Sequence, residues 1–428
     1  MNIFEIRLLL IVWAFRAVGE GSVVSFACSL CNHLIPNMAA SIVIVGAGLA
    51  GLTLKRALTQ YGIPATLYES YNGPPRHAYS MTLEPRVSKS LWQMLGLGEQ
   101  EFRRAVAVDG EGRIHASSLF SETQLHAGAF RASRKMLEGL LRSHGDKQSP
   151  SPSFAEHGVV GGAGLYGGDS GLGLDVGSGP RIKAQTLVLA DGVHSRLRKG
   201  LLPNARGPEV LPFITYNGKR RMPKATYDKV YAPAMDGATT LDMHFDGCLL
   251  QLALNDIDKK TGIVGLSYTY SRKVRLGDEK ELHRPDRATG AATSIPDAFY
   301  EEIDRLRELP KPFADAFDVE QIKKDRVLHW LMRTIYVPPA DLEALAGEGA
   351  VLIGDAAHAQ PILGGSGGNS AILDGLQLAE HISRHGTDRL ADFVDEQLPR
   401  WKEDATTCLR RIDEMHTRGG HAKEYSSL

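Results

Sequence analysis

A buried strand that runs directly into a glycine-rich turn constrains this chain most. Residues 42–45 are an uninterrupted β-branched run, typical of a parallel strand buried on both faces. Gly46, Gly48 and Gly51 follow in G-x-G-x-x-G spacing, which permits a tight turn, close approach of a pyrophosphate and close packing of the next helix. A second strand then ends at Glu69, whose carboxylate can accept hydrogen bonds from ribose hydroxyls. The order of these elements predicts a dinucleotide-binding site.

The same glycine spacing occurs again at residues 162–167. No strand is predicted before this second match, and more glycines follow where a helix would have to begin, so we predict no nucleotide site there. One residue of the first match is unusual, because Lys55 lies near the helix face that meets the sheet. Its aliphatic stem is expected to snorkel outward.

The composition is that of an ordinary globular protein. Hydrophobic residues make up 43% of the 428 residues, charged residues 23%, and the net charge is −1. This balance indicates no nucleic-acid partner. The four cysteines include one C-x-x-C pair, Cys28 and Cys31, which we interpret as unrelated thiols, and no metal site is predicted.

Residues 1–37 form an N-terminal extension with a short apolar run at residues 8–15, flanked by Arg7 and Arg16. The run is shorter than the about 20 residues that span a bilayer. It is open to three interpretations: a signal-peptide core, an interfacial helix, or an error in the assigned start, since Met38 is a natural first residue. Membrane contact is expected only through this extension. We expect a cytoplasmic protein if the chain starts near Met38, and a membrane-associated or secretory one otherwise.

Three internal segments continue the pattern of strands and helices. Residues 130–141 predict an amphipathic helix with Arg134 near its start, where the side chain either reaches an anionic cofactor group or is a solvated charge. Residues 186–190 predict a strand, and Asp191 follows in an Asp-Gly turn before a basic helix start, a junction suited to phosphates. The stretch 146–179 is rich in glycine, serine and proline and predicts a loop or weak strands.

Residues 211–339 differ from the rest, because strand-like runs are gathered there without regular alternation with helices. This predicts an antiparallel sheet in a second lobe. In the run 263–270, Tyr268 and Tyr270 share one face of the strand by its period of two. A long polar helix, residues 390–416, closes the chain.

The strand pattern returns at residues 350–353, where a Gly-Asp turn places Asp355 at a strand end. Its carboxylate is suited to ribose or ribityl hydroxyls. Gly367 and Gly368 end a glycine-rich loop before a predicted helix. This loop and helix start can bring backbone N–H groups to an electron-rich ring.

Three separated motifs therefore occur in one order: Gly46-x-Gly48-x-x-Gly51, Asp191-Gly192 and Gly354-Asp355. Together they resemble those of the FAD-dependent aromatic hydroxylases, the single-component flavoprotein monooxygenases that include salicylate and para-hydroxybenzoate hydroxylases. The resemblance runs from residue 40 to residue 385. The segment 326–333 (Arg-Val-Leu-His-Trp-Leu-Met-Arg) resembles the secondary-metabolism branch of this family.

The resemblance implies an α/β fold, with a Rossmann-like FAD-binding domain of the para-hydroxybenzoate hydroxylase type, an inserted, mainly antiparallel substrate lobe and a C-terminal helix. We place the first part of the FAD-binding domain at residues 38–205 and the substrate lobe at 206–342. The second part, with the C-terminal helix, is placed at 343–428.

The resemblance also implies roles by position. Glu69 would bind the adenosine ribose, and Arg134 would contact the cofactor near the flavin. Asp191 would belong to the element that supports FAD and the passing nicotinamide. Asp355 would bind the ribityl or pyrophosphate region of FAD.

Gly367 and Gly368 would approach the isoalloxazine ring. Tyr268 and Tyr270 are candidates to hydrogen-bond a phenolic substrate between the flavin and the second lobe, with packing inside the sheet as the alternative. His358 is expected to be structural, because it lies within the cofactor loop.

The implied function is hydroxylation or epoxidation of a small organic substrate, such as an aromatic, polyketide or terpenoid molecule. FAD is the implied cofactor, NADPH or NADH the electron donor and O₂ the oxygen donor. Two alternatives stay open: a flavin-dependent reductase or halogenase on the same fold, and a flavin-binding protein without turnover. The sequence does not identify the substrate, the position oxidised or the oligomeric state.

Overall fold

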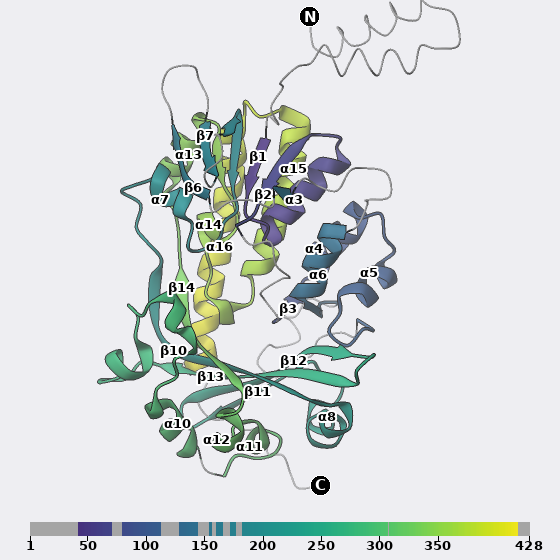
Figure 1. The fold of residues 1–428 in the computed structure, drawn as a ribbon, viewed down its shortest axis with the longest axis vertical. Helices are drawn as coiled ribbons and strands as arrows, with labels where there is room; N and C mark the ends of the chain where they lie inside the picture. Colours follow the sequence, from purple (N-terminus) through teal and green to yellow (C-terminus); the bar gives the residue numbers. More distant parts are fainter. Residues whose placement is uncertain are drawn as a thin grey trace, which may run out of the picture. The chain divides into compact units, whose positions relative to one another are not determined.

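The computed structural model describes residues 42–70, 79–112, 128–143, 154–155, 160–165, 172–176, 182–306 and 308–417 (Figure 1). The predictions for residues 1–37, which include Cys28 and Cys31, lie outside this part of the chain, as do parts of the stretch 146–179. Across the described ranges, no helix combines the length and the apolarity needed to cross a bilayer.

A five-stranded parallel sheet carries the glycine-rich turn at its centre. Its strand order is β15-β9-β1-β2-β5, and every neighbouring pair is parallel. The four residues of β1 are buried, as expected for a strand covered on both faces. The strands are β1 (Ile42–Val45), β2 (Ala65–Tyr68), β5 (Phe154–Ala155), β9 (Thr186–Leu189) and β15 (Ala350–Leu352).

Two helices that follow glycine-rich turns pack against each other beside this sheet. They are α3 (Leu49–Gln60) and α15 (Gly367–His385). Lys55 of α3 does not interrupt the packing, because its Nζ donates a hydrogen bond to the carbonyl oxygen of Ala65 at 2.8 Å, where β2 begins. The side chain therefore runs outward, as expected, and ends at the first residue of β2.

A two-stranded antiparallel ribbon, β3 (Ser80–Leu83) and β4 (Phe130–Ser133), precedes the helix that carries Arg134. The predicted helix over 130–141 is wrong at its start, because residues 130–133 pair with β3 and α6 (Arg134–Ser143) begins only at Arg134. Phe130 and Ala132 are buried while Arg131 between them is not, which is the period of two of a strand. The neighbouring helices are α4 (Pro85–Met94) and α5 (Glu99–Val106).

The second glycine match does not form a nucleotide-binding turn. Its first four residues, 162–165, lie inside β6 (Val160–Leu165), so no strand-to-helix junction begins there. This strand forms a small antiparallel sheet with β7 (Leu172–Val176) and β8 (Ile182–Ala184). Weak strands were one of the two expectations for this stretch.

The second lobe contains the predicted antiparallel sheet, in the order β11-β12-β13-β10-β14. Its strands all lie between residues 209 and 334, whereas those of the parallel sheet lie at 42–189 and 350–352. The predicted boundaries at residues 205 and 342 fall between these sets and stay predictions. The strands are β10 (Glu209–Pro223), β11 (Thr240–Phe245), β12 (Cys248–Asp258), β13 (Ile263–Lys273) and β14 (Arg326–Thr334).

One face of this sheet is apolar and packs on short helices, which Figure 1 shows beneath it. The other face carries small polar side chains and meets the β3–β4 ribbon, where Ser80 Oγ donates to the carbonyl oxygen of Leu254 at 2.9 Å. The helices of the lobe are α8 (Lys224–Val230), α9 (Ala232–Met235), α10 (Asp297–Asp304), α11 (Phe313–Ala316) and α12 (Val319–Ile322).

The predicted C-terminal helix is α16 (Leu390–Thr417), drawn in yellow in Figure 1. It contacts both lobes through α13 (Pro339–Gly347), α15 and β12. It thereby ties the parallel sheet to the antiparallel one. The remaining elements are α7 (Arg196–Leu201), α14 (Asp355–His358), η1 (Glu279–His283), η2 (Thr289–Thr293) and η3 (Ile362–Gly364).

Candidate functional site

The turn after β1 and the first turn of α3 leave no room for a side chain at Gly46 or Gly51. Gly46 has a φ of 106°, and a Cβ added there would lie 2.3 Å from the carbonyl oxygen of Ala190 and 2.8 Å from Cα of Asp191. A Cβ on Gly51 would lie 2.0 Å from the carbonyl oxygen of Gly46. The glycines thus let the backbone of the first motif touch the Asp-Gly turn of the second.

Glu69 lies at this turn, as the sequence predicts for an acid at the end of β2. Its Oε2 accepts a hydrogen bond from the backbone N–H of Ala47 at 2.7 Å. Arg142 donates to the carbonyl oxygen of Ala47 at 3.2 Å. Helix α3 begins directly after this turn with no acidic residue in its first turn and no side-chain cap. Its N-terminus is therefore suited to an anionic pyrophosphate.

Arg134 approaches the same turn from α6. A Cβ added to Gly48 would lie 4.0 Å from Nη2 of Arg134. The guanidinium is held from two sides, because it donates to Glu138 Oε1 at 2.7 Å and to the hydroxyl of Tyr79. Sequence reasoning missed Tyr79 and Glu138, although Glu138 stands four residues after Arg134, the spacing of a helical ion pair.

Asp355 presents a carboxylate that the protein leaves available. Among the described residues it has neither a hydrogen-bond donor nor an ion-pair partner for its side chain, and it is exposed to solvent. Protein atoms nevertheless surround it, so desolvation raises the pKa of its carboxyl, against the opposing effect of His358 and Arg134. Its Oδ1 lies 3.8 Å from the position of a Cβ on Gly367. An accessible acceptor beside a glycine-rich loop fits a ligand hydroxyl.

The start of α15 is fastened to the β3–β4 ribbon. Asn369 donates through Nδ2 to the carbonyl oxygen of Thr82 at 2.9 Å and accepts from the N–H of Glu84 at 3.1 Å. A Cβ on Gly368 would lie 2.5 Å from Cε of Met81, so the backbone there packs directly on that side chain. Beside this loop, neither amide atom of the buried Gln360 finds a partner among the described residues, which fits a polar ligand.

A buried carboxylate that sequence reasoning missed holds the Gly354-Asp355 turn. Asp374 Oδ2 accepts from the N–H of Gly354 at 2.6 Å and pairs with Nε2 of His358 at 2.7 Å. Its Oδ1 accepts from Nε1 of Trp401 at 2.8 Å and from Arg400.

Asp374 is fully buried, and burial alone would raise its pKa. The charges and hydrogen bonds of His358 and Arg400 outweigh burial and hold the pKa at about 2. His358 also stacks on Trp401, with 4.6 Å between ring centroids. These contacts give His358 the structural role expected for it.

Arg198 joins the second motif to the third. Its Nη1 donates to the carbonyl oxygen of Ala356 at 2.7 Å, and its Nη2 donates to that of Val193 at 3.1 Å. Asp191 lies in the same loop, where burial raises the pKa of its carboxyl and its buried Oδ1 has no partner among the described residues. The three motifs therefore converge, although Gly46 and Asp355 are 309 residues apart in the chain.

Tyr268 and Tyr270 pack in the core of the second lobe, which favours the packing alternative over the catalytic role. Tyr268 donates to Asp325 Oδ2 at 3.0 Å and Tyr270 to Glu302 Oε1 at 2.7 Å, and both rings are buried on the apolar, helix-covered face of the sheet. Ser80 meets the sheet on its opposite, polar face. The period of two placed both rings on one face, but their contacts show that this face packs in the core.

The Tyr268→Phe variant is expected to lose about 1 kcal/mol of unfolding free energy and to keep its turnover. Asp325 still pairs with Arg220 at 2.7 Å, so no buried charge is left alone. Urea unfolding and substrate-stimulated NADPH oxidation measure the two quantities. A tenfold fall in turnover at unchanged flavin content would show that the hydroxyl serves the reaction after all.

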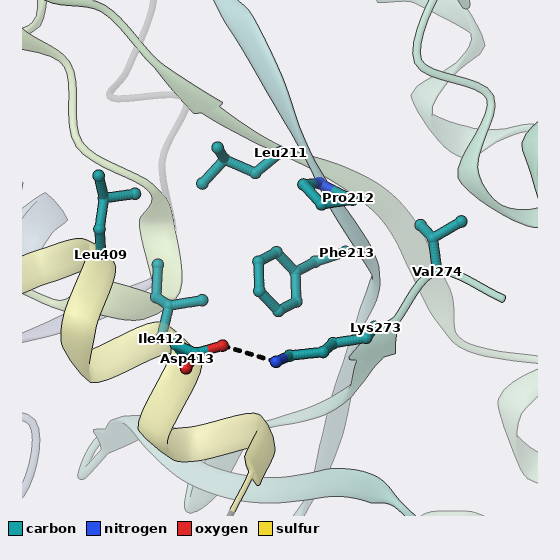
Figure 2. Close-up of a pocket in the computed structure, with 8 residues that line it drawn as sticks. All are labelled: Leu211, Pro212, Phe213, Lys273, Val274, Leu409, Ile412 and Asp413. Atoms are coloured by element: carbon teal, nitrogen blue, oxygen red, sulfur yellow. Dashed lines mark hydrogen bonds and ion pairs between the residues drawn. The ribbon is translucent and has the colours of Figure 1, made fainter.

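A separate apolar hollow of about 360 Å³ lies between β10, β13 and α16 (Figure 2). Figure 2 shows the ion pair of Lys273 and Asp413, 2.6 Å apart, at its edge. None of the predicted cofactor residues lines it, so it is distinct from the convergence of the three motifs. Its lining consists of Leu211, Pro212, Phe213, Lys273, Val274, Leu409, Ile412 and Asp413.

The fold and the site together define a class of flavin-binding enzyme. A family model described as an FAD binding domain matches residues 39–213. The FAD-dependent monooxygenase nscC of Aspergillus fumigatus is 30% identical over 397 residues, 88% of this chain and 94% of the relative. The FAD-dependent monooxygenase aptC of Emericella nidulans is 31% identical over 364 residues, 81% of this chain and 86% of the relative.

The chain belongs to the FAD-dependent monooxygenase family. This confirms the predicted oxidoreductase class with FAD as cofactor and with NAD(P)H and O₂ as co-substrates. The fold also agrees with that of 2,6-dihydroxypyridine-3-hydroxylase from Arthrobacter nicotinovorans, at a TM-score of 0.64 and 18% identity, over 90% of this chain and 93% of that one.

Proposed function

We propose that the three converging motifs bind FAD and that this monooxygenase oxygenates a small aromatic or polyketide molecule of secondary metabolism. The observation that carries the proposal is the meeting of Glu69, Arg134 and Asp355 around one glycine-rich turn and loop. The fungal relatives support the assignment to secondary metabolism.

When bound, FAD supplies the chemistry, passing electrons from NAD(P)H to O₂ so that one oxygen atom enters the substrate. The protein binds and orients the cofactor. The α3 N-terminus would face the pyrophosphate, Glu69 would accept from the adenosine ribose, and Asp355 would accept from a ribityl hydroxyl. Arg134, held by Tyr79 and Glu138, adds a fixed positive charge beside the turn.

The polar face of the antiparallel sheet is the proposed location of the substrate. Asn217 and Thr269 hydrogen-bond each other there at 2.9 Å, and Ser267 hydrogen-bonds Asn255 at 3.3 Å. Asn255 also accepts from Ser80 of the β3–β4 ribbon at 3.1 Å, which brings this face next to the cofactor side of the molecule. Hydroxyl and amide groups of this kind suit the oxygen atoms of a phenol or a ketone.

The purified protein tests the proposal directly. We expect a yellow protein that oxidises NADPH faster when a substrate is present and consumes O₂ as it forms an oxygenated product. A panel of phenols, polyketides and terpenoids identifies the substrate class. Oxygen-independent turnover would favour a flavin-dependent reductase, and a halide-dependent product would favour a halogenase. A folded protein that binds flavin but does not turn over would favour a flavin-binding protein without turnover.

The Asp355→Ala variant is expected to lose most of its FAD, at least a tenfold fall in affinity, while its fold is retained. The side chain of Asp355 makes no hydrogen bond or ion pair with the described residues, so its removal costs the fold little but deletes an acceptor for the cofactor. Flavin absorbance per mole of purified protein and far-UV circular dichroism measure the two effects. Flavin content equal to that of the wild type would refute this role.

A further inference from the structure

Arg131 of β4 carries a positive charge that no carboxylate contacts. Its Nε donates to Ser80 Oγ at 3.0 Å, its Nη2 to the carbonyl oxygen of Ser80 at 3.0 Å, and its Nη1 to Thr82 Oγ1 at 3.4 Å. All three acceptors are neutral. Among the residues that the structure describes, no Asp or Glu oxygen lies within 4.0 Å of this guanidinium. The ribbon therefore fixes the orientation of the side chain without cancelling its charge.

Other half-buried arginines near this ribbon pair with an acid. Arg134, at the start of α6, pairs with Glu138 at 2.7 Å, and Arg103 of α5 pairs with Glu99 at 2.9 Å. A guanidinium has five N–H groups, and Arg131 uses one on each of its three nitrogens. One N–H therefore remains free on each of Nη1 and Nη2. Together these two groups form the fork that binds both oxygens of a carboxylate.

The ribbon presents Arg131 to the polar face of the antiparallel sheet. Ser80, which accepts from Arg131, donates to the carbonyl oxygen of Leu254 on β12 at 2.9 Å. Asp242 of β11 lies close enough for its charge to act on Arg131, although its Oδ1 already accepts from Nε2 of Gln251 at 2.7 Å. Burial lowers the pKa of Arg131 to about 10, against the opposing effect of Asp242. A charged guanidinium thus lies where the ribbon meets β11 and β12 at neutral pH.

Thr82 connects this position to the glycine-rich loop of the cofactor site. Its hydroxyl accepts from Arg131, and its carbonyl oxygen accepts from Nδ2 of Asn369 near the start of α15 at 2.9 Å. The preceding residue, Met81, points to the opposite side of the strand and packs on Gly368. One face of β3 therefore meets the loop, and the other face holds Arg131. A ligand bound to Arg131 lies within the width of one strand from that loop.

We propose that Arg131 binds the carboxylate of an aromatic acid substrate through its two free N–H groups. The inference rests on the proposed function, since it presumes that FAD occupies the neighbouring site. A carboxylate matches the guanidinium in charge and in the spacing of its two oxygens, whereas a neutral phenol or ketone matches neither. The hydroxyl and amide groups on the polar face of the sheet then bind the neutral oxygens of the same molecule.

The test measures binding to the oxidised, FAD-loaded enzyme, followed by the change in flavin absorbance and by calorimetry. The probes are hydroxybenzoic and hydroxynaphthoic acids, each paired with its methyl ester, which keeps the ring but lacks the charge. We expect the wild type to bind at least one acid about tenfold or more tightly than its ester. R131Q should bind the two equally, with flavin content at the wild-type value, and R131K should restore part of the preference.

Arg221 provides the matched control, because it belongs to the same sheet and its side chain is 62% exposed, so R221Q should keep the preference. D242N is a second variant that leaves Arg131 in place. Loss of a nearby negative charge should tighten binding of the acid several-fold and leave the ester unchanged.

A wild type without preference for any acid, or an R131Q protein that keeps the preference, overturns the assignment. If R131Q does not fold, D242N decides, and an unchanged affinity for the acid in that variant also overturns it. A wild-type protein that is folded but holds no flavin would instead refute the proposed function itself.

Discussion

Replacing Asp374 with alanine is expected to lower the unfolding free energy by about 3 to 5 kcal/mol and to release FAD. The carboxylate is fully buried and joins the N–H of Gly354, His358, Arg400 and Trp401. Its removal leaves the Arg400 charge without its buried partner and frees the turn that presents Asp355. The effect on FAD is therefore indirect, through the position of that turn. Denaturant unfolding and flavin absorbance measure the two losses.

Asp404→Ala is the matched control for this variant. Asp404 also pairs with Arg400, at 3.3 Å, but its side chain is 29% exposed, so solvent screens the interaction. We expect a loss of no more than about 1 kcal/mol and full flavin content. Equal effects of the two substitutions would show that the buried network has no special part in holding the cofactor loop.

The same carboxylate predicts a pH dependence of stability. Its folded pKa of about 2 lies below the unfolded value of about 3.9, so its contribution is fully present above pH 3.9 and is lost as the pH falls towards 2. The shift corresponds to about 2 to 3 kcal/mol. The difference in melting temperature between the wild type and Asp374→Asn should therefore shrink below pH 4. A difference that is constant between pH 6 and pH 3 would contradict this linkage.

The Gly46→Ala variant is expected to abolish FAD binding, with at least a tenfold fall in flavin content. An added methyl group would meet the carbonyl oxygen of Ala190 at 2.3 Å, and the φ of 106° strains any residue with a Cβ. Relief of the clash moves the first motif away from the Asp-Gly loop of the second. Flavin absorbance of the purified variant measures the loss.

Gly62→Ala separates backbone strain from steric clash. Gly62 also has a positive φ, 69°, but no atom lies within 4 Å of its added Cβ. We expect this variant to lose about 1 to 2 kcal/mol of stability and to keep its FAD. A Gly46→Ala protein with a full complement of flavin would show that the turn relaxes without disturbing the cofactor site.

Local patterns in the sequence predicted much of the cofactor site. The β-branched run before Gly46, the acid at Glu69 and the turn at Asp355 each depend on neighbours within a few residues. The residues that sequence reasoning missed lack such a signal. Asp374 is an ordinary acid in a helical pattern, and Arg198 resembles the other basic residues around it. Their roles depend on partners 16 to 158 residues away.

By itself, the sequence determined the family, the parallel strand with its phosphate-binding turn, and the order of the three motifs, because glycine spacing and strand hydrophobicity act over short distances. The tertiary structure alone decided which face of β13 is covered. Tyr268 and Tyr270 share a face in any strand. Only the tertiary structure shows that this face packs against α10–α12 in the core. It likewise decided that Asp374 pairs with His358 and Arg400, since an ion pair depends on which distant groups the fold brings near.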